Sequence, residues 1–126
     1  TLSEYDCKFF LATGQEPEEQ KILKEIISSY KEKCVSLDKL SISETLPIIK
    51  NCRLAICNDS SFSHFSASLG LPTIVLVCDT PLLYGSYSPN MYPILPEGFK
   101  TVSHGTNGKE KINPKNIFDK LKNIIT

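Results

Sequence analysis

The chain has 126 residues, of which 40% are hydrophobic and 22% are charged, proportions typical of a folded globular domain rather than a disordered segment. Its 14 basic residues balance its 14 acidic residues, so the composition gives no sign of the basic surface that binds nucleic acid. No apolar run in the sequence approaches the roughly 20 residues that a membrane-spanning helix needs. The chain therefore corresponds to one globular domain or to one lobe of a larger protein.

Short apolar segments alternate with segments of helical periodicity as far as Cys78. The predicted elements, in chain order, are a strand over Cys7–Ala12, a helix starting at Pro17 with an apolar stripe up to Tyr30, a strand over Cys34–Leu37, a helix from about Ser43 to Asn51, a strand over Leu54–Cys57, a helix that ends at Leu69, and a strand over Thr73–Cys78. Such alternation is typical of a parallel sheet covered on both faces. The sequence therefore predicts a three-layer, Rossmann-like α/β fold with at least four parallel strands.

The start of the second helix is ambiguous. Ser41 and Glu44 have the spacing of a capping box, which predicts a helix that begins just after Ser41. Pro47 would then lie well inside that helix, where it removes a hydrogen bond and clashes with the preceding turn. A start at Ser43 reduces this conflict without removing it.

The pattern changes between Asp79 and Lys111, where four Pro, four Gly and three Tyr residues indicate loops. We expect one short strand in this stretch, around Lys100–Ser103. The pair Asn113-Pro114 then predicts the start of a last helix. Its apolar positions are Ile117, Phe118, Leu121, Ile124 and Ile125.

The cysteines number five, and no two of them form a CxxC pair. Four of them lie in or beside apolar segments, and an odd count disfavours a disulfide framework. We therefore expect free thiols in the core of a cytosolic protein. His64 and His104 are far from any pair of cysteines, so the sequence predicts no zinc site.

Ligands of open parallel sheets bind at the carboxyl ends of the strands. The predicted loops at those ends that carry polar groups are Thr13–Glu19, Asn58–His64 and Asp79–Tyr87. In the middle loop, Ser60 and Ser61 stand at a helix N-terminus, whose free N–H groups attract anions such as phosphate. His64 shares a face of that helix with both serines. The alternative is plain N-capping by Asp59 or Ser60 with an exposed His64.

Two other kinds of site, a serine hydrolase site and a nucleotide-binding P-loop, have less support in the sequence than the anion site. A serine nucleophile at Ser60 or Ser61, with His64 as its base, would need a third orienting group and an oxyanion hole, and the G-x-S-x-G elbow is absent. The segment Gly105–Lys109 lacks the spacing of a P-loop, and Glu110 replaces its hydroxyl residue. Tyrosines 84, 87 and 92 fit either the lining of a cleft or the packing of a loop.

One segment carries a more specific signal. Residues 54–73 (LAICNDSSFSHFSASLGLPT) resemble the signature of the ADP-heptose:lipopolysaccharide heptosyltransferases, glycosyltransferase family nine. This signature has a hydrophobic strand, then Asp-Ser/Thr-Gly-x-x-His, then a helix of small residues that ends in Gly-x-Pro-Thr. Weaker likenesses occur at Thr13–Glu19, Leu40–Glu44 and Tyr87–Pro89, and together they cover roughly residues 8–126.

The resemblance implies a GT-B glycosyltransferase, of which residues 1–126 would be the C-terminal lobe that binds the nucleotide-sugar donor. The implied donor-binding residues are Asp59 (sugar or diphosphate region), Ser60 and Ser61 (phosphate), His64 (beside the phosphate), Glu18 (ribose hydroxyls, with Glu16 or Glu19 as alternatives) and Leu40 (adenine). The implied partners are ADP-heptose as donor and a lipid-linked saccharide as acceptor. The implied reaction is an inverting transfer in lipopolysaccharide synthesis without metal or cofactor. The implied location is cytoplasmic, and peripheral attachment to the inner membrane face stays open.

Three departures from the signature shape these expectations. Ser61 replaces the glycine of the family motif. The lobe's first strand, with its phosphate-binding Thr and Lys, has no counterpart, and neither has the N-terminal lobe with the acceptor site and the catalytic base. We therefore expect a fragment that contains no catalytic residue and transfers no sugar alone. The alternative is a non-catalytic nucleotide-binding module or a flavodoxin-like signalling module.

Overall fold

The computed structural model describes residues 5–126, so the first four residues of the predicted lobe lie outside the described part. The chain divides into two compact units, one up to Thr45 and one from Leu46 to Thr126, which we call unit 1 and unit 2. Each unit contains its own parallel sheet. The predicted α/β class with parallel strands is therefore confirmed.

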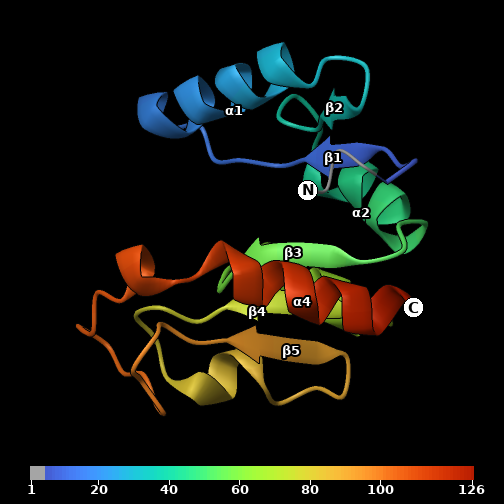
Figure 1. Cartoon of the computed structure of the whole chain (residues 1–126). Helices are drawn as coiled ribbons and strands as arrows, with labels where there is room; N and C mark the ends of the chain where they lie inside the picture. The colour runs from blue at the N-terminus through green and yellow to red at the C-terminus, as the bar shows by residue number, and fades with distance from the viewer. Residues whose placement is uncertain (1–4) are drawn as a thin grey trace. The chain divides into compact units, whose positions relative to one another are not determined.

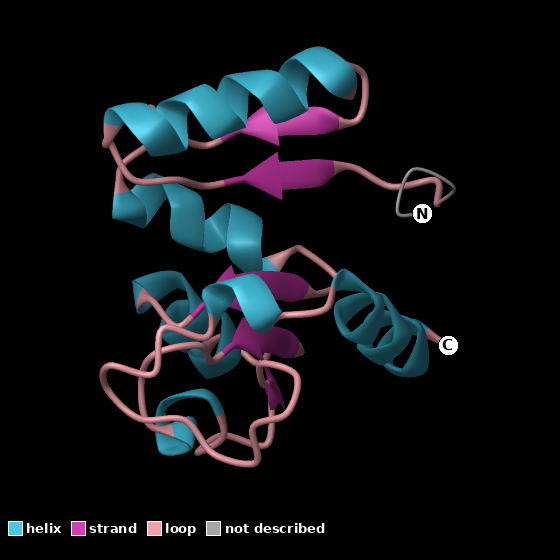
Figure 2. Cartoon of the chain, turned by 60° about the vertical axis from the view of Figure 1, so that its left-hand side comes forward, coloured by secondary structure: helices cyan, strands magenta, loops and turns pink. Residues whose placement is uncertain are grey.

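Unit 1 is a strand–helix–strand unit. Its elements are β1 (Phe9–Leu11), α1 (Pro17–Ser29) and β2 (Cys34–Ser36). The strands pair in parallel, with Phe9 opposite Cys34, and α1 connects them and packs against β2 (Figure 2). Pro17 occupies the first turn of α1, where its missing N–H costs nothing because no intrahelical acceptor exists there. All three elements lie where the sequence predicts them.

Few apolar side chains of unit 1 are fully covered. Leu23 is the buried residue of α1, although the predicted stripe also contains Ile22 and Tyr30, which are both exposed. Among the described residues of unit 1, Leu37, just after β2, is the other buried apolar residue. The apolar spacing therefore predicts the helix correctly, but it overestimates how much of the helix is buried.

Helix α2 (Ile42–Lys50) begins one residue earlier than predicted, because the capping box does form. The Ser41 N–H and hydroxyl groups both donate to Glu44 Oε2, at 2.8 and 2.9 Å, and the Glu44 N–H lies 3.3 Å from the Ser41 hydroxyl. Pro47 lies inside the helix. Of the two starts that the sequence left open, the one just after Ser41 is the one that forms, one residue before the other estimate of about Ser43.

Unit 2 has three layers. Its sheet contains β3 (Ala55–Asn58), β4 (Thr73–Leu76) and β5 (Met91–Ile94), parallel and in that order. Helices α3 (Ser61–Ser68) and α4 (Pro114–Ile125) lie on opposite faces of this sheet (Figures 1 and 2). Two short 3-10 helices, η2 (Leu82–Gly85) and η3 (Lys109–Lys111), belong to the connections that follow β4 and β5.

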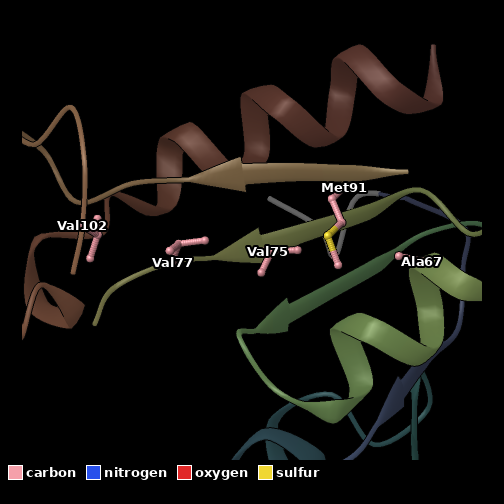
Figure 3. Close-up of a cluster of buried hydrophobic side chains, with 5 residues drawn as sticks. All are labelled: Ala67, Val75, Val77, Met91 and Val102. Atoms are coloured by element: carbon pink, nitrogen blue, oxygen red, sulfur yellow. The ribbon is translucent and has the colours of Figure 1, made fainter. Parts of the chain in front are cut away.

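The core of unit 2 forms around the central strand β4. Thr73, Ile74 and Val75 are completely buried, as expected for a strand with neighbours on both sides and a helix on each face. One cluster of buried side chains contains Ala67, Val75, Val77, Met91 and Val102 (Figure 3). This core fixes the end of β4 and the start of the loop that follows it.

One prediction about the strands is corrected. The described strands pair into a two-stranded sheet in unit 1 and a three-stranded sheet in unit 2. The last strand is β5, which contains Pro93, and the segment Lys100–Ser103 is a loop. Proline is tolerated in β5 because this edge strand has a single neighbour, β4, and needs no donor on its outer side. Val102 lies in that loop and its side chain is buried in the core. A buried apolar residue at this position explains why the segment resembles a strand in the sequence.

The last helix agrees with the sequence. Asn113 is its N-cap, and the Asn113 side chain accepts a hydrogen bond of 2.9 Å from the Lys115 N–H. Leu121 is the buried residue on its inner face. No helix within residues 5–126 is both long enough and apolar enough to cross a bilayer.

All five cysteines are free thiols. Their placement differs from the predicted core, because Cys7 is exposed and Cys34, Cys52, Cys57 and Cys78 are only partly buried. Burial raises the pKa of the Cys57 thiol to about 11, against a smaller opposite effect of its hydrogen bond with Ser66. Since the thiolate is the reactive form, Cys57 is chemically inert near neutral pH.

Candidate functional site

Two of the predicted loops come together in unit 2, at the edge where β3 and β4 end. The strands pair in parallel with Asn58 opposite Leu76, so their carboxyl ends face the same side. Asp59 follows β3 directly, and the Thr80 hydroxyl, in the loop after β4, donates a hydrogen bond to Asp59 Oδ2. The register of the sheet thus places these two loops against each other.

His64 extends this contact to Tyr87, at the far end of the loop that follows β4. Its Nε2 atom lies 3.5 Å from Asp59 Oδ1, and its Nδ1 atom lies 2.6 Å from the Tyr87 hydroxyl. The His64 and Tyr87 rings stack, with an interplanar angle of 16° and centroids 5.6 Å apart. Asp59, His64, Thr80 and Tyr87 therefore form one connected group, which we call the Asp59 cluster.

The N-cap of α3 is Ser60. The Ser63 hydroxyl accepts from the Ser60 N–H at 3.3 Å and donates to the Ser60 carbonyl oxygen at 2.7 Å, which closes the first turn. The Asp59 carboxylate is engaged by Thr80 and His64 instead. Of the two capping alternatives, Ser60 is confirmed and Asp59 is wrong, and His64 is bonded rather than merely exposed.

The first turn of α3 has donors without acceptors. Within residues 5–126, the backbone N–H groups of Ser61 and Phe62 meet no hydrogen-bond acceptor, as is usual at the first positions of a helix. Ser61 is exposed to solvent. These groups and the helix dipole give this end of α3 a partial positive charge that favours a bound anion.

The exposure of the Asp59 cluster increases outward. The Asp59 side chain is 11% exposed and that of His64 is 40% exposed, while Tyr87 is 54% exposed. The Asp59 side chain is thus nearly buried, whereas the rings of His64 and Tyr87 are accessible to solvent. Both nitrogens of His64 already face Asp59 and Tyr87, so no serine hydroxyl is hydrogen-bonded to a base here, and the geometry disfavours the hydrolase alternative.

The segment that superficially suggests a P-loop has a structural role. The Asn107 N–H donates to Asp79 Oδ1 at 2.8 Å, and the Gly108 N–H donates to the Cys78 carbonyl oxygen at 3.0 Å. Asn107 adopts a positive φ of 51°, which asparagine tolerates better than most residues. These N–H groups hold the loop to the end of β4 and are not free to bind phosphate.

Glu18 and Leu40 belong to unit 1 and are not part of the Asp59 cluster. Glu18 is exposed in the first turn of α1, and Leu40 is an exposed apolar residue after β2. The Gln15 side chain donates to the Asp38 carbonyl oxygen at 3.2 Å, so the loops that carry Glu18 and Leu40 adjoin each other.

The acidic alternatives to Glu18 differ in their surroundings. Glu16 is the N-cap residue of α1 without a side-chain capping bond. The Glu19 carboxylate lies against Gly14, in the space that a Cβ atom there would occupy. No group of three or more His, Cys, Asp or Glu side chains in the described part of the chain could hold a metal ion.

Thr80 and the bond made by Tyr87 are the parts of the site that sequence reasoning missed. A signal for Thr80 exists, since it lies in the predicted loop Asp79–Tyr87 after β4, at the same sheet edge as Asp59. Tyr87 belongs to one of the predicted loops, but its contact with His64 depends on the turn made by η2. No local pattern encodes that contact.

A known family matches this chain. The family model described as glycosyltransferase family 9 (heptosyltransferase) matches residues 1–122, and no curated protein or solved structure gives a significant match. Because the match covers nearly the whole sequence, the chain belongs to glycosyltransferase family 9. The predicted family is confirmed, the fold is compatible with a Rossmann-like half of a GT-B enzyme, and membership implies a sugar donor and an acceptor.

Proposed function

We propose that this member of glycosyltransferase family 9 binds the donor ADP-heptose at the N-terminus of α3 and the adjoining Asp59 cluster. The chain would form the C-terminal lobe of a GT-B enzyme. The observation that carries this proposal is the pair of unpaired N–H groups at Ser61 and Phe62, at the edge where β3 and β4 end. A diphosphate is the part of the donor that such a helix end binds best.

The side chains around these N–H groups suit different parts of the donor. The exposed hydroxyls of Ser60 and Ser61 can donate to phosphate oxygens. Asp59 would repel a diphosphate if it were close and uncompensated. Since Thr80 and His64 engage its two oxygens, we assign Asp59 to orienting the loop and to accepting hydrogen bonds from sugar hydroxyls.

The same donors would assist the chemical step. When the bond between the anomeric carbon and the diphosphate oxygen breaks, negative charge grows on the departing nucleoside diphosphate. Fixed N–H groups at a helix N-terminus stabilise that charge without reorganisation. We assign the base that deprotonates the acceptor, and the binding of a lipid-linked saccharide, to another lobe. The complete enzyme would then act in lipopolysaccharide synthesis on the cytoplasmic side, and residues 1–126 alone would transfer no sugar.

Unit 1 would contribute to nucleoside recognition. We propose that Glu18 accepts hydrogen bonds from the ribose hydroxyls and that Leu40 contacts the adenine ring. Support comes from their exposure and from the Gln15–Asp38 bond that joins their loops. Both loops follow the carboxyl ends of parallel strands, as donor-binding loops of such folds do.

Calorimetric titration of this chain with ADP, AMP and adenosine tests the proposal. Ser61→Pro removes one N–H donor without breaking α3, because proline is favoured at the first helical position and Ser60 is already extended. We expect about tenfold weaker ADP binding, the loss for one hydrogen bond to a charged group. Ser61→Gly loses the hydroxyl, as Ser61→Pro does, but keeps the N–H, so it should bind ADP more tightly than Ser61→Pro. The control Ser68→Ala, at the other end of α3, should bind like the wild type.

Two results would contradict the proposal. One is equal affinity of the chain for ADP and adenosine, since it would show that no diphosphate site exists. The other is unchanged ADP affinity in Ser61→Pro. In a protein that contains both lobes, Asp59→Asn should reduce sugar transfer severely, whereas Ser61→Gly should retain it.

A further inference from the structure

The His64 ring is held at both of its nitrogen atoms. Nε2 faces the Asp59 carboxylate at 3.5 Å, and Nδ1 lies 2.6 Å from the Tyr87 hydroxyl. Asp59 is itself fixed from its other side by Thr80. The orientation of His64 therefore depends on one nearly covered anchor and on one exposed residue.

Hydrogen-bond chemistry assigns a direction to these contacts. A neutral imidazole has one N–H donor and one acceptor nitrogen, and an ionised carboxylate can only accept. In the neutral imidazole this geometry favours a proton on Nε2, which lies 3.5 Å from Asp59 Oδ1, because a lone pair at Nε2 would point toward the lone pairs of that oxygen. Nδ1 is left as an acceptor, and the Tyr87 hydroxyl is its donor.

The Tyr87 ring adds a second restraint. Its ring lies nearly parallel to the imidazole, with an interplanar angle of 16° and centroids 5.6 Å apart, so the contact between the two rings opposes rotation of the His64 side chain. Tyr87 contributes little to the core because it is more than half exposed. Removal of its hydroxyl should therefore leave the fold intact.

We infer that Tyr87 is a positioning residue, which keeps His64 in the Nε2–H tautomer with this edge turned to Asp59 and the β3–α3 loop. The consequence for binding rests on the proposed function: a nucleoside diphosphate at the N-terminus of α3 would meet a pre-oriented imidazole. Pre-orientation raises affinity because the ring need not be ordered when the ligand binds.

Nitrogen-15 NMR of the full 126-residue chain tests the inference directly. The chain has two histidines, so His104 is an internal reference. At alkaline pH, where histidine side chains are neutral, wild-type His64 should show the Nε2–H tautomer. Tyr87→Phe should shift the Nδ1 resonance of His64 and leave His104 unchanged. A dominant Nδ1–H tautomer in the wild type, or unchanged His64 resonances in Tyr87→Phe, would overturn the inference.

The matched control is Tyr84→Phe, because Tyr84 is also exposed and packs edge-on against His104. Its His64 resonances should equal those of the wild type. ADP affinity should fall about two- to tenfold in Tyr87→Phe, the cost of ordering one side chain on binding, and stay constant in Tyr84→Phe. If the wild type binds no ADP, the proposed function fails, while the tautomer measurement still decides the role of Tyr87.

Discussion

Units 1 and 2 are built from the same strand–helix–strand pattern, yet they bury very different amounts of it. In unit 2, the central strand β4 has a strand on each side and a helix on each face, and Ile74 is completely buried. In unit 1, the two-stranded sheet has no central strand, and Ile22 on α1 is 53% exposed. Apolar periodicity therefore reports the type of element, whereas burial depends on how many neighbours that element has.

The same contrast holds for the polar loops. In unit 2, Asp59, His64, Thr80 and Tyr87 hold one another in place. In unit 1, Glu18 lies exposed at the start of α1. A site whose side chains bond to one another is organised before a ligand arrives, whereas exposed side chains lose rotamer freedom on binding.

The same substitution, isoleucine to alanine, made once in each unit is the strongest test of this difference in burial. Ile74→Ala removes a completely buried side chain and should cost about 2–5 kcal/mol in the free energy of unfolding. Ile22→Ala removes a largely exposed side chain from a helix, where alanine has the best propensity, and should change stability by less than about 0.5 kcal/mol. Urea unfolding of both variants measures the difference, and equal losses would contradict the contrast in burial.

Alanine substitutions at Gly85 in unit 2 and Gly14 in unit 1 should show the same contrast in packing, with smaller losses of stability. A Cβ atom at Gly85 would overlap Val77 Cγ2 and lie 3.2 Å from Val75 Cγ1, both in the packed core. Gly85→Ala should therefore cost about 1–3 kcal/mol. A Cβ atom at Gly14 would meet only the Glu19 carboxylate, which can swing into solvent, so Gly14→Ala should be nearly neutral. Melting temperatures of the two variants test this, and a large loss in Gly14→Ala would show that Glu19 is not free to move.

Most of the fold is predictable from sequence because its signals are local. The clearest strand, β4, is a continuous apolar run, and Gly70 ends the α3 segment with a positive φ of 83°, as its type and position predict. Strand β5 was not predictable, because Pro93 hides it and its pairing with β4 requires knowledge of the sheet edge.

The candidate site was predictable only in part, for the same reason. The sequence places Asp59, Ser60, Ser61 and His64 at a strand-to-helix junction, and the structure has that junction. Thr80 and Tyr87 reach Asp59 and His64 across 21 and 23 residues of sequence. Such contacts follow from the register of β3 with β4 and from the turn at η2, which are tertiary features.

The smallest expected effect concerns the helix caps, of which one can titrate and the other cannot. The Ser41 N–H and, to a lesser extent, the Ser41 hydroxyl lower the pKa of Glu44 from its ordinary 4.5. Asn113, the N-cap of α4 in unit 2, carries no charge. The contribution of the first cap to stability should therefore depend on pH, and that of the second should not.

The direction follows from linkage between proton binding and folding. The unfolded chain binds the Glu44 proton more readily than the folded chain. The cap therefore stabilises the folded state fully at pH values above the ordinary pKa, and it loses this effect as pH falls through the lowered pKa of the folded state.

Glu44→Gln should thus be less stable than the wild type at neutral pH, and the difference should shrink toward strongly acidic pH. In a Ser41→Ala background the pH-dependent difference should shrink but persist, because the hydroxyl is lost while the backbone N–H of residue 41, the larger cause of the lowered pKa, still donates to the carboxylate. Asn113→Ala should cost about 1 kcal/mol at every pH. Urea unfolding midpoints across the acid range test all three, and a difference between Glu44→Gln and wild type that grows as pH falls would show that the carboxylate is stabilised in its protonated form instead.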